Sequence, residues 1–91
     1  MVTVDAQALG EEWKCHVVVD HEAEHTEHSV TVTQDDLKRW GRGTEREDVE
    51  DLVRRSFEFL LQREPPSSIL RTFDLPVIQR YFPEFDREIR K

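Results

Sequence analysis

The fold is decided by the run Phe57-Glu58-Phe59-Leu60-Leu61-Gln62-Arg63-Glu64-Pro65-Pro66 and by the segment after it, Ser67-Ser68-Ile69-Leu70-Arg71-Thr72-Phe73-Asp74-Leu75-Pro76-Val77-Ile78. The first part is a dense apolar helix that the double proline ends, because the residue before a proline avoids the helical region and proline donates no backbone hydrogen bond. In the second part Asp74 is the predicted N-cap of a short helix. The pattern predicts a folded C-terminal half and contains no recognisable catalytic or ligand-binding motif.

The main helix is predicted over residues 45–63, with a capping-box pattern at Thr44 and Glu47. Its apolar arc covers roughly half of the circumference, wider than the ~100° stripe of a helix with one buried face. The helix is therefore expected either to be sandwiched inside the fold or to share its surface with a partner. A shorter helix is predicted upstream, with Thr33 as N-cap and Asp36 three residues on. The arc consists of Val49, Leu52, Val53, Ser56, Phe57, Phe59, Leu60 and Leu61.

Two runs of alternating residues, 13–19 and 28–33, predict strands, because β-branched residues with a period of two are typical of a half-buried sheet. Residues 20–27 are expected to form a moderately long acidic loop, since they contain no Gly or Asn for a tight turn. Residues 1–12 form either a flexible acidic arm or a short edge strand. The prediction is one α+β domain over 1–91. It contains a β-hairpin, or a three-stranded antiparallel sheet, packed on one long helix and two or three short helices.

Four stretches carry a resemblance to known sequences: the strand His28-Ser29-Val30-Thr31-Val32, the helix end 57–64, the segment 68–78 and the ending Arg80-Tyr81-Phe82-Pro83-Glu84-Phe85. In these stretches the chain resembles a family of small uncharacterised prokaryotic proteins. It implies a common fold of strand, helix, proline turn and Phe-Pro ending. These hypothetical proteins have no established activity, so the resemblance implies no catalytic residues.

Composition and charge exclude several classes of protein. No run approaches the roughly 20 apolar residues of a membrane span, and Met1-Val2-Thr3-Val4-Asp5 lacks the features of a signal peptide. The single cysteine, Cys15, gives no reason to expect an oxidising compartment, so we expect a cytoplasmic protein. No cofactor is predicted. The formal net charge is −7, of which residues 1–28 carry −6. This charge disfavours nucleic-acid binding, and it suggests that the acidic segment steers the chain toward a basic protein.

A metal site is the first candidate site, because four histidines and several carboxylates are concentrated in residues 15–28. Zinc or nickel needs three or four such ligands converging on one point. His21 and His25 would share a face in a helical loop, and His28 could lie across a hairpin from Cys15 or His16. The alternative is a solvated acidic loop whose histidines only tune its charge near neutral pH.

Nucleophilic catalysis by Cys15 is the second candidate. Cys15 lies on the strand face of Trp13 and Val17, where a small buried hydrophobic residue is expected. His16 points to the other face, and His28 reaches Cys15 in only one register. No oxyanion-stabilising group is evident, so the chain is predicted not to be an enzyme and no catalytic residue is assigned.

Association with protein is the third candidate. Aromatic side chains interleaved with Arg71 and Arg80 are typical of interface anchors. Alternatively, the C-terminal segments fold back and cover the helix themselves. The chain is predicted to be a non-enzymatic interaction or regulatory module that binds a protein partner or forms a homodimer, with a metal-binding protein as the alternative. The predicted interaction residues are Phe57, Phe59, Leu61, Phe73, Tyr81, Phe82 and Phe85.

Overall fold

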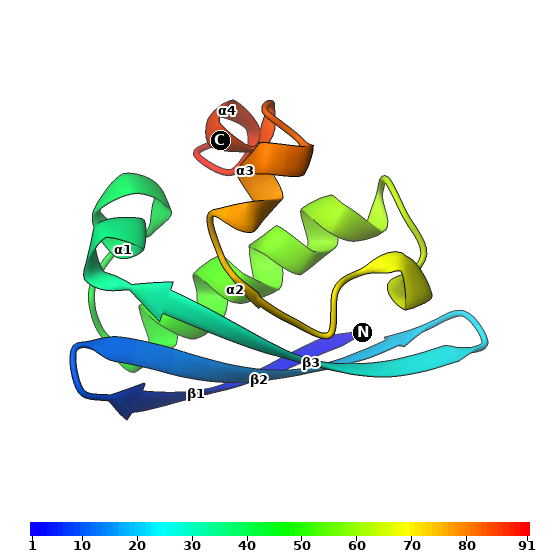
Figure 1. Cartoon of the computed structure of the whole chain (residues 1–91), viewed down its shortest axis with the longest axis horizontal. Helices are drawn as coiled ribbons and strands as arrows, with labels where there is room; N and C mark the ends of the chain where they lie inside the picture. Colours follow the sequence, from blue (N-terminus) through cyan, green and yellow to red (C-terminus); the bar gives the residue numbers. More distant parts are fainter.

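The N-terminal part of the chain forms a three-stranded antiparallel meander, and the C-terminal half adds a fourth strand (Figure 1). The computed structural model describes all residues, 1–91. The strands are β1 (Val2–Leu9), β2 (Glu12–His21), β3 (Glu24–Thr33) and β4 (Thr72–Asp74). The short β4 runs parallel to β3, so the sheet order is β1-β2-β3-β4. The predicted α+β class is confirmed, but the sheet has four strands, one more than the largest sheet predicted.

The period of two along the strands gives the sheet one apolar face and one polar face. The register places Ala6 opposite Cys15 and Cys15 opposite Val30 on the apolar face. The polar face carries exposed side chains such as Lys14, His16 and Glu27. The fully or almost fully buried side chains of the apolar face are Ala6, Cys15, Val17, Val19, His28, Val30 and Val32.

Both hairpins have two-residue turns, Gly10-Glu11 and Glu22-Ala23. The predicted acidic loop over 20–27 is therefore wrong, since β2 and β3 continue pairing up to His21 and Glu24. The lack of Gly was misleading because Glu22 itself adopts the left-handed backbone that such a turn requires, with φ 57°. Residues 2–9, for which an arm and an edge strand were both open, form the edge strand β1.

The C-terminal two-thirds are mainly helical. Thr33 caps α1 as predicted, because its hydroxyl accepts the N–H of Asp36 while the Asp36 carboxylate accepts the N–H of Thr33. The next helix begins one residue later than predicted, with Glu45 as its N-cap, and Asp74 ends β4 instead of capping a helix. The helices are α1 (Gln34–Trp40), α2 (Arg46–Leu61), the 3₁₀ turn η1 (Pro66–Ser68), α3 (Val77–Tyr81) and α4 (Phe85–Glu88).

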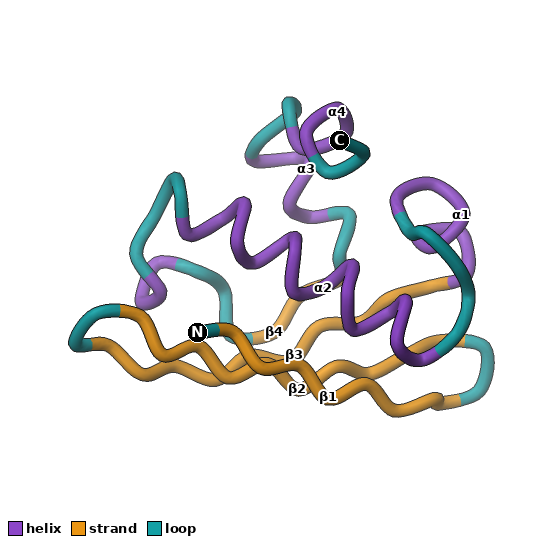
Figure 2. Tube along the Cα trace, turned by 180° about the vertical axis from the view of Figure 1, so that it is seen from behind, coloured by secondary structure: helices purple, strands orange, loops and turns teal.

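Helix α2 lies between the apolar face of the sheet and the layer formed by α3 and α4 (Figures 1 and 2). On the sheet side, the Phe57 ring packs against His28, with ring centroids 5.2 Å apart, and against Phe73. On the other side, Phe59 packs against Phe82 and Phe85. The wide apolar arc is thus buried on two sides of one helix. The prediction is one long helix with two or three short ones, whereas the structure has four α-helices, of which α2 with 16 residues is the longest. None of them has the length and apolar character to cross a membrane.

Candidate protein-interaction site

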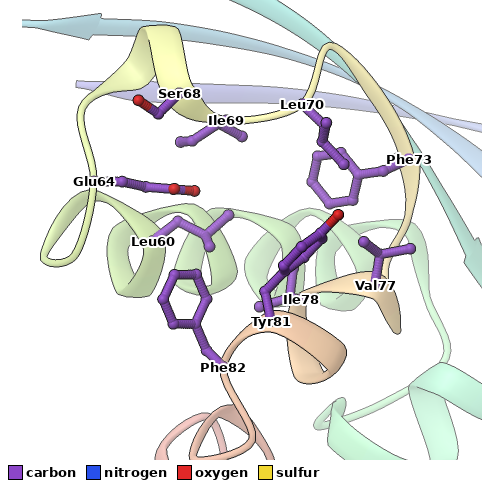
Figure 3. Close-up of a pocket in the computed structure, with 10 residues that line it drawn as sticks. All are labelled: Leu60, Glu64, Ser68, Ile69, Leu70, Phe73, Val77, Ile78, Tyr81 and Phe82. Carbon is purple, nitrogen blue, oxygen red and sulfur yellow. The ribbon is translucent and has the colours of Figure 1, made fainter.

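An apolar groove of about 240 Å³ opens between the end of α2, the segment that follows η1, and α3 (Figure 3). Eight of its ten lining residues are hydrophobic, and Glu64 is the only charged one. All of the lining residues lie within residues 60–82, so the groove is formed by successive segments of the chain. Its lining consists of Leu60, Glu64, Ser68, Ile69, Leu70, Phe73, Val77, Ile78, Tyr81 and Phe82.

The double proline explains why the chain opens a groove at this place. Pro65 ends the helical segment and Pro66 begins η1, so the chain turns back toward the sheet instead of continuing along α2. Ile69, which follows η1, and Phe73, which lies on β4, are both buried. Their burial fixes the segment between them against the core. Leu70 lies between these two anchors and remains outside.

The edge of the groove exposes apolar surface. Tyr81 is 68% exposed and Leu70 is 47% exposed, and the only other exposed large hydrophobic side chains are those of Met1 and Leu9. Figure 3 shows Leu70, Phe73 and Tyr81 gathered toward one end of the groove and Glu64 at the other. Burying such surface against a partner is favourable by about 25 cal/mol per Å² of apolar area.

Three charged side chains in and beside the groove have no polar partner within the chain. Partial burial raises the pKa of Glu64 above its usual value, and the carboxylate forms no side-chain hydrogen bond or ion pair that would oppose this shift. Of the ten arginines, eight donate a hydrogen bond or form an ion pair. The two that do neither are Arg71, which follows Leu70, and Arg80, which precedes Tyr81.

A buried histidine fixes the segment that carries Leu70. His28 Nδ1 donates to the Leu70 carbonyl at 2.7 Å, and the hydroxyl of Thr26 donates to Nε2 at 2.9 Å, so the neutral ring is satisfied at both nitrogens. Burial lowers the pKa of His28, and the Leu70 hydrogen bond opposes this shift only in part. His28, a metal candidate in the sequence, is therefore a support of the groove from the sheet side.

The structure separates the predicted interaction residues into two groups. Phe73, Tyr81 and Phe82 line the groove. Phe57 and Phe85 are completely buried in the core, Phe59 is 7% exposed, and Leu61 packs against the core from a partly buried position. Within the first group Tyr81 is exposed and Phe82 is partly buried, whereas Phe73 lines the groove as a buried residue, 8% exposed.

The metal candidates His21, His25 and His28 are not brought together. His16 pairs with Glu27 at 2.9 Å and His25 with Asp20 at 2.6 Å, both on the exposed face of the sheet, and His25 Nε2 also lies 3.7 Å from the Glu27 carboxylate. The hydrogen bond to Asp20 raises the pKa of His25. His28 lies on the opposite, buried face, and His21 is at the end of β2. No group of three or more His, Cys, Asp or Glu residues could hold a metal ion.

Cys15 lies on the buried face, opposite Val30 and not opposite His28. Burial first, and then the nearby charges of Glu50 and Asp5, raise the pKa of the thiol to about 12. The thiol is therefore protonated at neutral pH, whereas a nucleophile needs the thiolate.

Sequence reasoning did not select six of the hydrophobic and charged groove residues. A signal was present, because the pair Ile69-Leu70 stands between the double proline and Arg71, and consecutive side chains of an extended segment cannot both face the core. One of these two side chains therefore had to be exposed. The missed residues are Leu60, Glu64, Ile69, Leu70, Val77 and Ile78.

Comparison of the chain with protein-family models, with curated proteins and with solved structures gave no match. The resemblance to small prokaryotic proteins therefore stays a prediction. The geometry of the chain itself carries the functional argument.

Proposed function

We propose that this chain is a non-enzymatic protein-interaction module that binds a segment of another protein in the groove between α2, the segment after η1, and α3. The observation that carries the proposal is the combination of an apolar groove with the exposed side chains of Leu70 and Tyr81 at its edge. Exposed apolar side chains that adjoin a pocket are typical of protein-binding surfaces.

The size of the groove favours a side chain over a small molecule. Its volume of about 240 Å³ lies below the roughly 300–1,000 Å³ of most small-molecule sites. A single large side chain that anchors a protein interface needs less room than a cofactor or metabolite. Within the groove Glu64 is the only carboxylate, and the only other acid–base side chain, Tyr81, lies away from it (Figure 3), which supports binding and not catalysis.

The proposal is tested by placing the photo-crosslinking amino acid p-benzoylphenylalanine at position 81 and, as a control, at position 9. Both sites carry exposed large apolar side chains, but Leu9 lies at the end of β1, beside the first hairpin turn. The two variants are expressed in the cells that make the protein, irradiated, and analysed by mass spectrometry.

We expect position 81 to give one dominant adduct that position 9 does not give. The adduct should disappear when Val77→Trp, a substitution at a partly buried groove position, fills the groove. Equal adducts at both positions, or an adduct that persists in the filled groove, would overturn the proposal. Circular dichroism of each variant checks that it is folded.

A further inference from the structure

We infer that the segment bound by the groove carries one large apolar side chain with carboxylates beside it, which Arg71 and Arg80 bind. This inference rests on the proposed function and gives the chemistry of the partner at the same site. Arg71 and Arg80 are the two arginines whose side chains form no hydrogen bond or ion pair, and both are sequence neighbours of the exposed apolar residues at the groove edge. An arginine recognises a carboxylate through its planar set of donors.

Each of the two arginines adjoins a groove residue in the chain. On α3, Arg80 directly precedes Tyr81 and lies three residues after Val77, so it is a surface neighbour of Val77. Val77 and Tyr81 line the groove. Arg71 directly follows Leu70 on the other wall. Two walls of the apolar pocket thus each carry an arginine next to a groove residue, within a chain whose net charge is −7.

Glu64 makes the two ends of the groove electrostatically different, because it is the only charged lining residue. It lies at the end of the groove away from Leu70 and Phe73 (Figure 3). A carboxylate of the partner would be repelled at that end and attracted at the other. We therefore expect the acidic residues of the partner to lie toward Leu70 and Tyr81, with the apolar side chain inserted between them and Glu64.

The test is an NMR titration of the ¹⁵N-labelled chain with a short peptide that has a central leucine and two glutamates on each side. Three matched peptides replace the leucine by serine, the glutamates by glutamines, or the glutamates by lysines. We expect the acidic leucine peptide to shift the amides of Leu70, Phe73 and Tyr81 and to bind most tightly. Its affinity should fall between about 50 and about 500 mM salt, since ion pairs at the surface are screened.

The protein variants make the test residue-specific. Arg71→Gln and Arg80→Gln should each weaken binding of the acidic peptide roughly two- to five-fold, and Glu64→Gln should strengthen it. Lys38→Gln, an equal change of charge at an exposed position on α1, should leave the affinity unchanged.

Two results would overturn the inference: tighter binding of the lysine peptide, or no shift of groove amides by any peptide. In either case the crosslink at position 81 decides separately whether the groove is a docking site at all. A crosslinked second copy of this chain would also overturn the inference.

Discussion

The reactivity of one residue, Cys15, follows from its burial. With its pKa raised to about 12, the thiol should not react with an aromatic disulfide reagent at pH 8 as long as the sheet is intact. Labelling should therefore require opening of β2 and should accelerate with urea in parallel with the loss of circular dichroism. Fast labelling of the native chain would contradict the buried position. The variant Cys15→Ser, which has no thiol, measures the background signal of the reagent.

The buried ring of His28 makes stability depend on pH. Its folded-state pKa lies below the unfolded value of 6.5, so the unfolded chain binds more protons between the two values. The stability contributed by neutral His28 is present above about pH 6.5 and is lost as the pH falls through the folded pKa. The measurement is urea unfolding at about pH 7.5 and about pH 5.5.

His28→Asn is the matched variant, because an amide donor can still reach the carbonyl of Leu70 but does not titrate. Wild type should lose more stability than this variant between the two pH values. The comparison cancels the opposite contribution of His25, whose raised pKa stabilises the fold at lower pH. An equal loss in both proteins would show that His28 does not titrate on folding.

Single residues also show what the sequence could and could not reveal. The alternation of 28–33 places His28 on the same face as Val30 and Val32, so its burial was accessible from the pattern. Its partner, the carbonyl of Leu70, is 42 residues away, and no local signal specifies that contact. The role of His28 as a support of the groove therefore required the tertiary structure.

At the scale of the element, the two hairpin turns can be compared directly, because both have two residues and both begin with a residue of positive φ. Gly10 has φ +64°, and a Cβ atom added to it would meet no other atom within 4 Å, so glycine is needed there only for its backbone conformation. Glu22 occupies the corresponding first position of the second turn with φ 57°. A left-handed backbone costs a residue with a side chain about 1–2 kcal/mol. Glycine adopts this backbone without steric cost, but it loses more conformational entropy on folding, which offsets part of the gain.

Glu22→Gly should therefore stabilise the protein by about 0.5–1 kcal/mol, and Gly10→Ala should destabilise it by about 1 kcal/mol. The control is Ala23→Gly, because Ala23 follows Glu22 in the same turn and has no positive φ. This control should be neutral or destabilising. Urea unfolding of the four proteins decides the matter, and a Glu22→Gly protein no more stable than Ala23→Gly would refute the strain at Glu22.

Among the elements, those with strong local signals were predicted best. The capping box of Thr33 and Asp36 predicted the start of α1, and the double proline predicted an end of the main helix at residue 63, two residues beyond the observed end at Leu61. The three-residue β4 was missed because Thr72–Asp74 is too short for a period-two pattern, and because parallel pairing to β3 is a long-range interaction. The groove was missed for the same reason, since β4 sets where its wall runs.

At the scale of the whole molecule, the sheet has one edge that α2 protects. The N–H of Ala6 on β1 donates to the Glu50 carboxylate at 3.0 Å. The Arg46 guanidinium contacts the carboxylates of Asp5 at 2.7 Å and Glu50 at 3.5 Å. Arg46 on α2 therefore links Glu50 on the same helix to Asp5 on the edge strand. An unprotected edge strand offers its backbone groups to a second chain, and charged groups at the edge are a common defence against such pairing.

This arrangement predicts that Glu50 controls self-association through β1. Glu50→Ala leaves the N–H of Ala6 without its partner, which should cost about 1–2 kcal/mol and open the edge to another copy. Glu50→Gln keeps an acceptor for that N–H and should be milder, while Glu58→Ala on an exposed part of α2 should have no effect.

Light scattering at equal concentration measures the average mass of each protein. We expect only Glu50→Ala to raise it clearly above wild type, because only this variant removes the acceptor that occupies the edge. An equal mass for Glu50→Ala and Glu58→Ala would mean that packing of α2 across β1, and not this hydrogen bond, keeps the edge closed.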